Sequence, residues 1–132
     1  MGNVYSAQNV AAYIIYELND LERFVNAMTI QEILADVDMM WQKVFGYCAF
    51  SETTHYLSEV GYTVKEVAES YKEFDAAQLL EPAKEWFLKY GEFQLVHRPY
   101  AIPNYTAKEQ LLMKKIINVY HLHNYNRVKM AV

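Results

Sequence analysis

The sequence predicts a mainly α fold, a single compact domain of about five helices with small β or irregular pieces near 47–60 and 92–97. Three observations lead to this prediction. Apolar residues recur at helical spacing over several long stretches. Ser or Thr stands at the positions where these stretches begin, as helix N-caps do. Gly and Pro fall mostly between the stretches, where they punctuate helices.

Length and composition indicate one folded domain covering residues 1–132. The chain has 132 residues, of which 53% are hydrophobic and 21% are charged. This balance is typical of a globular protein rather than a disordered segment. Twelve Tyr and two Trp are many for this length. Such side chains serve cores and contact surfaces equally well, because they combine a large apolar area with a polar tip.

The first two helices have clear start signals. Ser6 precedes AQNVAAYIIYELNDLERF and is expected to cap a helix. Thr29, with Glu32 three residues later, predicts a capping box at the start of the second helix. Gly46 is expected to end that helix. The apolar positions of the second helix follow i, i+3, i+4 spacing: Ile30, Ile33, Leu34, Val37, Met40, Trp41 and Val44.

The centre of the chain mixes signals. Residues 47–60 have β-branched and aromatic character without a helical stripe, which favours a short strand or hairpin. Gly61 and Tyr62 are expected to form a bend. Thr63 and Glu66 then predict a second capping box. The short helix that follows has a narrow apolar face, made of Val64, Val67, Ala68 and Tyr71.

The next segment, AAQLLEPAKEWFLKY, is expected to be helical, with a cap at Asp75 paired with Gln78. Pro82 predicts a break near Glu81 and a restart of the helix. Gly91 is expected to close it. The following EFQLVHRPYAIPNY contains two prolines and predicts a loop or a short edge strand.

Thr106 and Glu109 predict a third capping box, at the start of the last helix. No acidic residue follows Glu109, so the first 109 residues carry a net charge of −8 and the remainder +4. The cations of this last part are Lys114, Lys115, Arg127 and Lys129. They form either a solvated face or a surface for phosphates, and Tyr120 and Tyr125 among them suit base stacking. The acidic pI of about 5.5 opposes nucleic-acid binding.

No catalytic, metal or cofactor site is expected. His121 and His123 stand two positions apart, so they point to different sides of a helix. Glu32 and Asp36, one helical turn apart, are interpreted as a solvated acidic edge. The chain has no glycine-rich phosphate loop and no GxSxG motif. The single Cys48 has no basic neighbour in sequence that would activate its thiol. These features indicate a protein that is not an enzyme.

The chain contains no window of 18 or more apolar residues, so no transmembrane helix is expected. It also lacks a basic start followed by an apolar run, the pattern of a secretory signal. One cysteine excludes a disulfide within the chain and fits a reducing, cytoplasmic setting.

Five stretches, taken in order, resemble the Panacea-domain antitoxins: YSAQNVAAYII, MTIQEIL, FGYCAF, GYTVKEVAESYKEF and YTAKEQLLMKKIINVY. This family, often carried by bacterial mobile elements and prophages, includes the SocA-like proteolytic adaptors. Its members resemble this chain in the order and spacing of these motifs, and the resemblance covers most of this chain. Two positions depart from the family pattern. Tyr62 replaces the proline of the bend, with one residue more before Val64, and Glu32 replaces a lysine of the second helix.

The resemblance implies a degenerate member of the family, a non-catalytic cytoplasmic protein that neutralises or sequesters a toxin by direct contact or delivers it to a protease. The expected contact residues are Tyr62, Lys65 and Tyr71 around the glycine bend, together with Arg98. For Tyr71 a place in the core is an equal alternative, since it lies on the apolar face. Lys65 is alternatively a solvated surface residue.

Three other readings remain open from the sequence. A phage protein with the same fold could be directed to a host defence factor instead of a toxin. A nucleic-acid-binding regulator would use the basic last helix. Exposed Tyr and Met side chains are also compatible with a homodimer.

Overall fold

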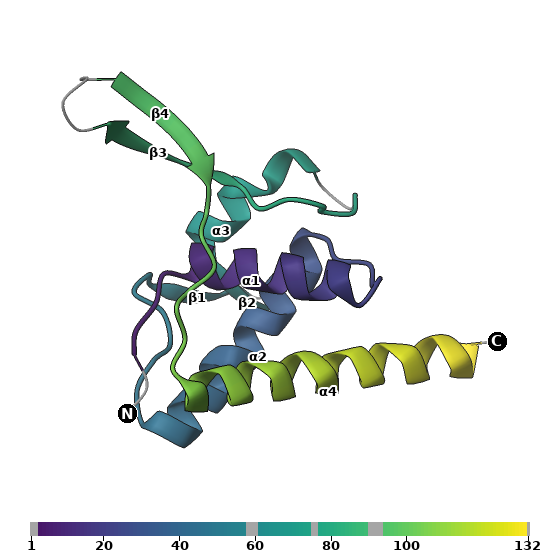
Figure 1. Ribbon diagram of the computed structural model, residues 1–132. Helices are drawn as coiled ribbons and strands as arrows, with labels where there is room; N and C mark the ends of the chain where they lie inside the picture. The colour runs from purple at the N-terminus through teal and green to yellow at the C-terminus, as the bar shows by residue number, and fades with distance from the viewer. Residues whose placement is uncertain (1–2, 58–60, 75–76, 90–93, 132) are drawn as a thin grey trace.

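The computed structural model describes residues 3–57, 61–74, 77–89 and 94–131. Within these ranges the fold is mainly helical, as predicted, with two small antiparallel hairpins (Figure 1). The helices are α1 (Ala7–Asp20), α2 (Ala27–Phe45), α3 (Lys65–Ser70) and α4 (Ala107–Ala131), and a 3-10 turn, η1, spans Lys72–Phe74. The described residues therefore contain four α-helices, against about five expected.

The hairpins are formed by neighbouring strands. Strand β1 (Thr54–Leu57) pairs with β2 (Gly61–Val64), and β3 (Lys84–Lys89) pairs with β4 (Gln94–Pro99). The β pieces expected near 47–60 and 92–97 are thus confirmed. Gly61 lies at the start of β2, opposite Leu57, and β2 runs directly into α3. An isolated parallel bridge between Tyr5 and Phe50 ties the N-terminal segment to the loop after α2.

The helix expected between residues 76 and 90 is wrong throughout the described residues, because 77–83 form neither helix nor strand and the residues after them form a strand. Lys84–Lys89 form β3, each residue of which has a partner in β4. The sequence KEWFLK contains Trp and Phe, which favour strands. Pairing with a strand ten residues away decides the conformation, which local helix propensity alone does not predict. Asp75 and Gly91, expected at the ends of that helix, lie outside the described residues.

Helix starts follow the predictions in part. The Ser6 side chain accepts from the Gln8 N–H at 3.2 Å, so the cap of α1 is confirmed. Helix α2 begins three residues earlier than predicted, because Asn26 and not Thr29 is its cap and accepts from the Thr29 N–H at 2.9 Å. The capping box at Thr63 is also wrong, since Val64 occupies the N-cap of α3 and provides no side-chain acceptor.

Two further end signals are confirmed. Gly46 caps the C-terminus of α2 with a φ of 87°, in the left-handed region where a glycine has no steric penalty. At the start of α4, the Thr106 N–H donates to Glu109 at 2.8 Å and the Glu109 N–H donates to the Thr106 hydroxyl at 3.3 Å. This is the reciprocal pair of hydrogen bonds that defines a capping box.

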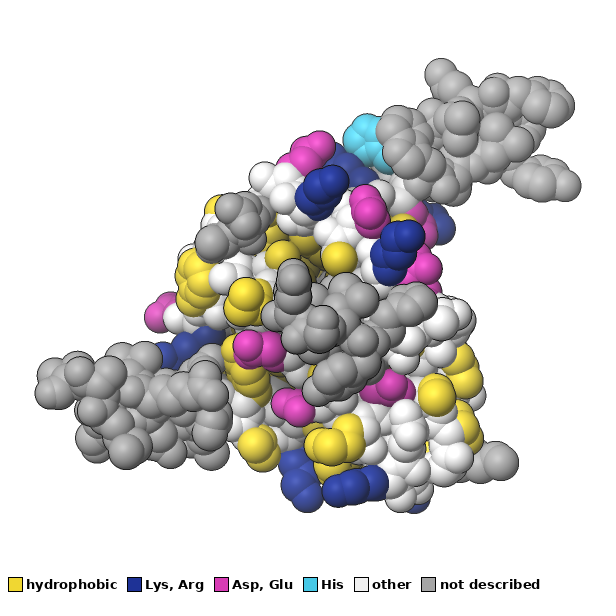
Figure 2. All heavy atoms as spheres, turned by 180° about the vertical axis from the view of Figure 1, so that it is seen from behind, with side chains coloured by type: hydrophobic (Ala, Val, Ile, Leu, Met, Phe, Trp, Pro, Cys, Tyr) yellow, Lys and Arg dark blue, Asp and Glu magenta, His cyan; other side chains and the backbone are white. Residues whose placement is uncertain are grey.

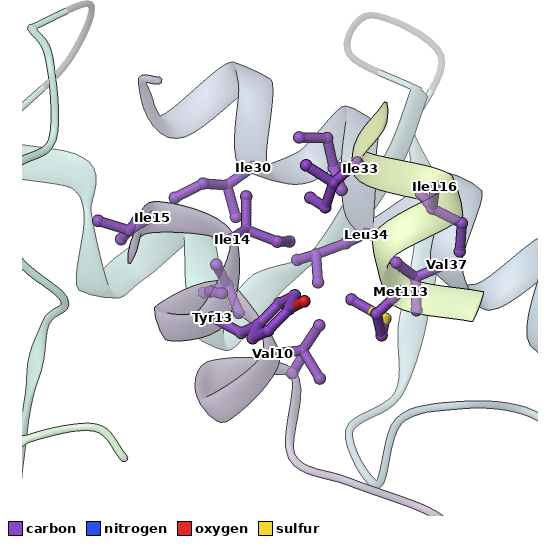
Figure 3. Packing of buried hydrophobic residues seen from close by; sticks show 14 of the residues in the cluster. Val10, Tyr13, Ile14, Ile15, Ile30, Ile33, Leu34, Val37, Met113 and Ile116 are labelled. Atoms are coloured by element: carbon purple, nitrogen blue, oxygen red, sulfur yellow. The ribbon is translucent and has the colours of Figure 1, made fainter. Parts of the chain in front are cut away.

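The core lies where α1, α2 and α4 meet. Figure 3 shows the apolar side chains of these three helices pointing toward one another. Helix α2 contributes Ile30, Ile33, Leu34, Val37 and Trp41, all buried as the predicted stripe requires. Val44, the last member of that stripe, is exposed.

Polar contacts hold the smaller elements on this core. The Gln31 side-chain amide accepts from the Val64 N–H at 2.9 Å and donates to the Val64 carbonyl at 3.1 Å, so α2 carries the end of β2. Gln8 of α1 donates to the Glu66 carbonyl at 2.9 Å and so holds α3. The hairpin β3–β4 projects from the helical body beyond α3 (Figure 1).

Candidate protein-binding surface

The four residues expected to contact a partner do not form one patch. Lys65 opens α3 and is exposed. Tyr62 lies three residues before it in β2, opposite Tyr56, and its side chain is outside the described part of the structure. Arg98 belongs to the other hairpin, and α3 lies between the two hairpins (Figure 1). The sequence therefore brings Tyr62 close to Lys65 and leaves Arg98 on a separate element.

The side chain of Tyr71 is 1% exposed. It therefore lies in the core, which was the alternative to a place on the contact surface. The Tyr71 hydroxyl oxygen accepts from the Ala83 N–H at 2.9 Å, just before β3 begins. Burial raises the pKa of Tyr71 to about 12. Tyr71 is thus a core residue that ties the second hairpin to α3, and a partner has no access to it in this conformation.

Arg98 is exposed and already has an acidic neighbour. Its Nε donates to the Glu85 carboxylate at 2.8 Å. The two residues lie directly opposite each other in the paired strands β3 and β4. An exposed pair of this kind contributes little to stability. Arg98 remains a surface cation whose charge is partly offset within the hairpin.

The cations proposed for nucleic-acid binding lie on α4. Lys114 and Lys115 are exposed. Arg127 and Lys129 fall within the helix, but their side chains are outside the described part of the structure. Successive helix positions point about 100° apart, so Lys114 and Lys115 share one broad side of α4. Two neighbouring cations on an otherwise acidic domain make a small basic surface.

Several buried or partly buried ionisable groups serve the fold. Glu109 accepts hydrogen bonds from Asn3, Tyr5 and Thr106. Burial raises its pKa, but these hydrogen bonds outweigh burial, and the pKa lies below its ordinary value. Glu52 is similar, because the Ala7 N–H and the Ser6 hydroxyl donate to it and lower its pKa against the effect of burial. Both carboxylates fasten the N-terminal segment to the body.

Helix α2 carries an exposed face that the sequence analysis did not identify as a contact surface. Met28 and Met39 are 69% and 50% exposed, and Glu32 and Asp36 are exposed between them. We call these four residues the Met–carboxylate stripe. Their spacing of four, four and three residues places them along one side of the helix, away from the buried stripe. Figure 2 shows apolar and acidic side chains next to each other on the lower half of the rear face.

The two carboxylates of the stripe repel each other. The pKa of Asp36 is raised by burial first and by the charge of Glu32 second. Glu32 accepts a 3.3 Å hydrogen bond from the Tyr120 hydroxyl of α4. Among the described residues, no ion pair joins either carboxylate to a cation. Within the described ranges the two negative charges of the stripe thus have no ion-pair partner.

The sequence contained a signal for this surface. Glu32 and Asp36 were interpreted as a solvated acidic edge, and the structure confirms that they are exposed. Met28 and Met39 lie on the same side of α2 as these two carboxylates. A second stripe at helical spacing, offset from the buried one and ended by large apolar residues, is the pattern that would have indicated a contact surface.

Within the described ranges, no group of three or more His, Cys, Asp or Glu side chains could hold a metal ion. No helix in the same ranges combines the length and the apolar character needed to cross a bilayer. Cys48 is exposed and not part of a disulfide. No protein-family model, curated protein or solved structure matches this chain.

Proposed function

We propose that the chain is a non-catalytic protein-binding module of antitoxin type, which neutralises or sequesters a partner protein by direct contact in the cytoplasm. The Met–carboxylate stripe is the observation that carries this proposal. Two exposed methionines lie on one side of the helix with two carboxylates between them, and their apolar area stays in contact with water. A partner that covers them removes this area from water.

The helix that presents the stripe is well fixed. The opposite side of α2 is buried against α1 and α4, and Trp41 donates its indole N–H to the Asn3 carbonyl at 3.0 Å. The buried Asp38 side chain accepts from the Ala49 N–H at 3.1 Å and so holds the loop after α2. A surface on such a helix binds without a large ordering cost, which favours affinity.

The resemblance to Panacea-domain antitoxins supports the same function and adds its biological setting. It implies a toxin encoded nearby, carried on a prophage or another mobile element. The acidic body of the chain suits a basic face on that toxin, since charges of opposite sign increase the rate and the specificity of association. A phage protein that binds a host defence factor would use the same surface and differ in its partner.

Co-expression tests the antitoxin proposal. The product of the gene next to this one is expressed in a growth assay, alone and with this chain. We expect the neighbouring product to inhibit growth, the chain to relieve the inhibition, and the two proteins to purify as a stoichiometric complex. Relief without a complex, or a complex without relief, contradicts neutralisation by contact. If a stable complex forms with a host protein instead, the retargeted version is correct.

Nucleic-acid binding is the second candidate, and the exposed Lys114 and Lys115 are what favour it. A gel-shift titration with duplex DNA at two salt concentrations separates the two functions. A protein that contacts phosphates through a few cations loses affinity steeply as salt rises. We expect weak binding with little dependence on salt. Tight, steeply salt-dependent binding that is lost in Lys114→Ala/Lys115→Ala would support the regulator instead.

A further inference from the structure

The Met–carboxylate stripe has a definite length and arrangement. Met28 and Met39 are eleven residues apart, which corresponds to about 16 Å along a helix. The two apolar side chains mark the ends, and the two carboxylates occupy the middle. Tyr120 of α4 borders the stripe through its hydrogen bond to Glu32. The surface is therefore apolar at both ends and negative at its centre.

The charges at the centre indicate what a partner must provide. Glu32 and Asp36 stand one turn apart, where like charges on a helix repel each other. Both influences on the pKa of Asp36, desolvation first and the charge of Glu32 second, act against its charged form. No cation of the described residues relieves them. A cation brought by a partner would gain attraction from both carboxylates at once.

We propose, on the basis of the protein-binding function above, that the Met–carboxylate stripe of α2 binds a basic amphipathic helix of the partner protein. Its Lys or Arg side chains lie against Glu32 and Asp36, and its apolar side chains lie against Met28 and Met39. Methionine suits this role because its flexible, polarisable side chain adapts to the apolar shape it meets. A helix fits because its own residues recur at the same three- and four-residue spacing.

A second copy of the same stripe is a poorer occupant. In an antiparallel pair of identical α2 helices, the centres of the two stripes coincide, because a two-fold interface repeats the same surface on both sides. Four carboxylates would then meet at the centre, where like charges oppose association. A basic helix of another protein avoids this repulsion and leaves the methionines the same apolar contact.

Methyl NMR of the full chain tests the proposal with a defined probe. The probe is a synthetic amphipathic helix of about 18 residues built from Leu and Lys, long enough to span the stripe. Its control has Glu in place of every Lys. The signals of the six methionine methyl groups are followed during titration. We expect the Met28 and Met39 signals to shift with the Lys peptide and to stay unchanged with the Glu peptide.

Matched variants identify the contribution of the carboxylates. In Glu32→Gln/Asp36→Gln we expect affinity for the Lys peptide to fall about tenfold, since each exposed charge pair contributes a modest amount. The control variant, Glu66→Gln/Glu69→Gln, removes the same charge from the exposed side of α3 and should bind as the original chain does. An equal loss of affinity for the Lys peptide in both variants would show that only the net charge of the protein matters, and this would overturn the proposal.

Other outcomes overturn it in different ways. Shifts at Met28 and Met39 that grow with protein concentration, without peptide, would assign the face to a second copy of the chain. Shifts confined to other methionines would place the contact elsewhere. If the partner found by co-expression binds Glu32→Gln/Asp36→Gln normally, the stripe is not its site while the protein-binding function stands. If no partner forms a complex, the function itself fails, whatever the peptide does.

Discussion

The Tyr5 hydroxyl donates a 2.7 Å hydrogen bond to the Glu109 carboxylate, 104 residues further along the chain. Glu109 is 0% exposed and also accepts from the backbone N–H groups of Asn3 and Thr106. The Tyr5 backbone pairs with the loop after α2, through Ala49 and Ser51. The Glu109 carboxylate thus joins the N-terminal segment to the start of α4.

Replacement of Glu109 by alanine should destabilise the protein by about 2–4 kcal/mol, because it leaves three donors without their acceptor at a buried site. Unfolding in urea measures the loss. The matched control is Glu69→Ala, on the exposed side of α3, which should change stability by about 0.5 kcal/mol or less. A Glu109→Ala loss no larger than that of the control would contradict the structural role of this carboxylate.

Acid should weaken the same attachment. The pKa values of Glu109 and Glu52 are lowered in the folded protein. Their contribution to stability is therefore fully present above the pKa of an unfolded Glu, about 4.3, and is lost as pH falls through the folded pKa. The free energy of unfolding should fall as the pH drops below that value. The fall should be shallower in Glu52→Gln/Glu109→Gln, and an equal slope in both proteins would refute the assignment.

The Gln31 side chain should contribute more to the free energy of unfolding than its half-buried position suggests. Its amide group satisfies both backbone groups of Val64, which is 0% exposed. Gln31→Ala leaves a buried donor and acceptor unpaired, at a cost of about 2–3 kcal/mol. Gln42→Ala, at an exposed position of the same helix, is the control. Hydrogen exchange at the Val64 amide should accelerate in the first variant, and unchanged exchange there would count against this contact.

The sequence predicted the helical part of the fold well, because its signals are local. Ser6, Gly46 and the Thr106–Glu109 pair act within a few residues, and the structure confirms each of them. The start of α2 was misplaced because Asn26 and Thr29 are both good caps, and the sequence does not show which one the preceding loop can present. Such an error moves a boundary without changing the element.

The second hairpin was missed because the conformation of its first strand depends on pairing with residues outside that segment. Lys84–Lys89 has ordinary helix-forming residues at its ends, and its pairing with Gln94–Pro99 prevails over them. The candidate surface was missed for a related reason. Met28 and Met39 are apolar, and whether such a residue is buried or exposed depends on which neighbours cover its side of the helix. Periodicity alone locates a stripe without showing whether another element packs on it.

Substitution of Tyr71 tests whether this residue stabilises the core or contacts a partner protein. Tyr71→Phe removes the oxygen that accepts from the Ala83 N–H and keeps the buried ring. We expect a loss of about 1–2 kcal/mol in urea unfolding and faster hydrogen exchange at Ala83. Tyr16→Phe, at an exposed tyrosine of α1, should change neither. Partner affinity should be the same in both variants, because the Tyr71 side chain lies inside the fold. Loss of binding with stability unchanged would return Tyr71 to the contact surface.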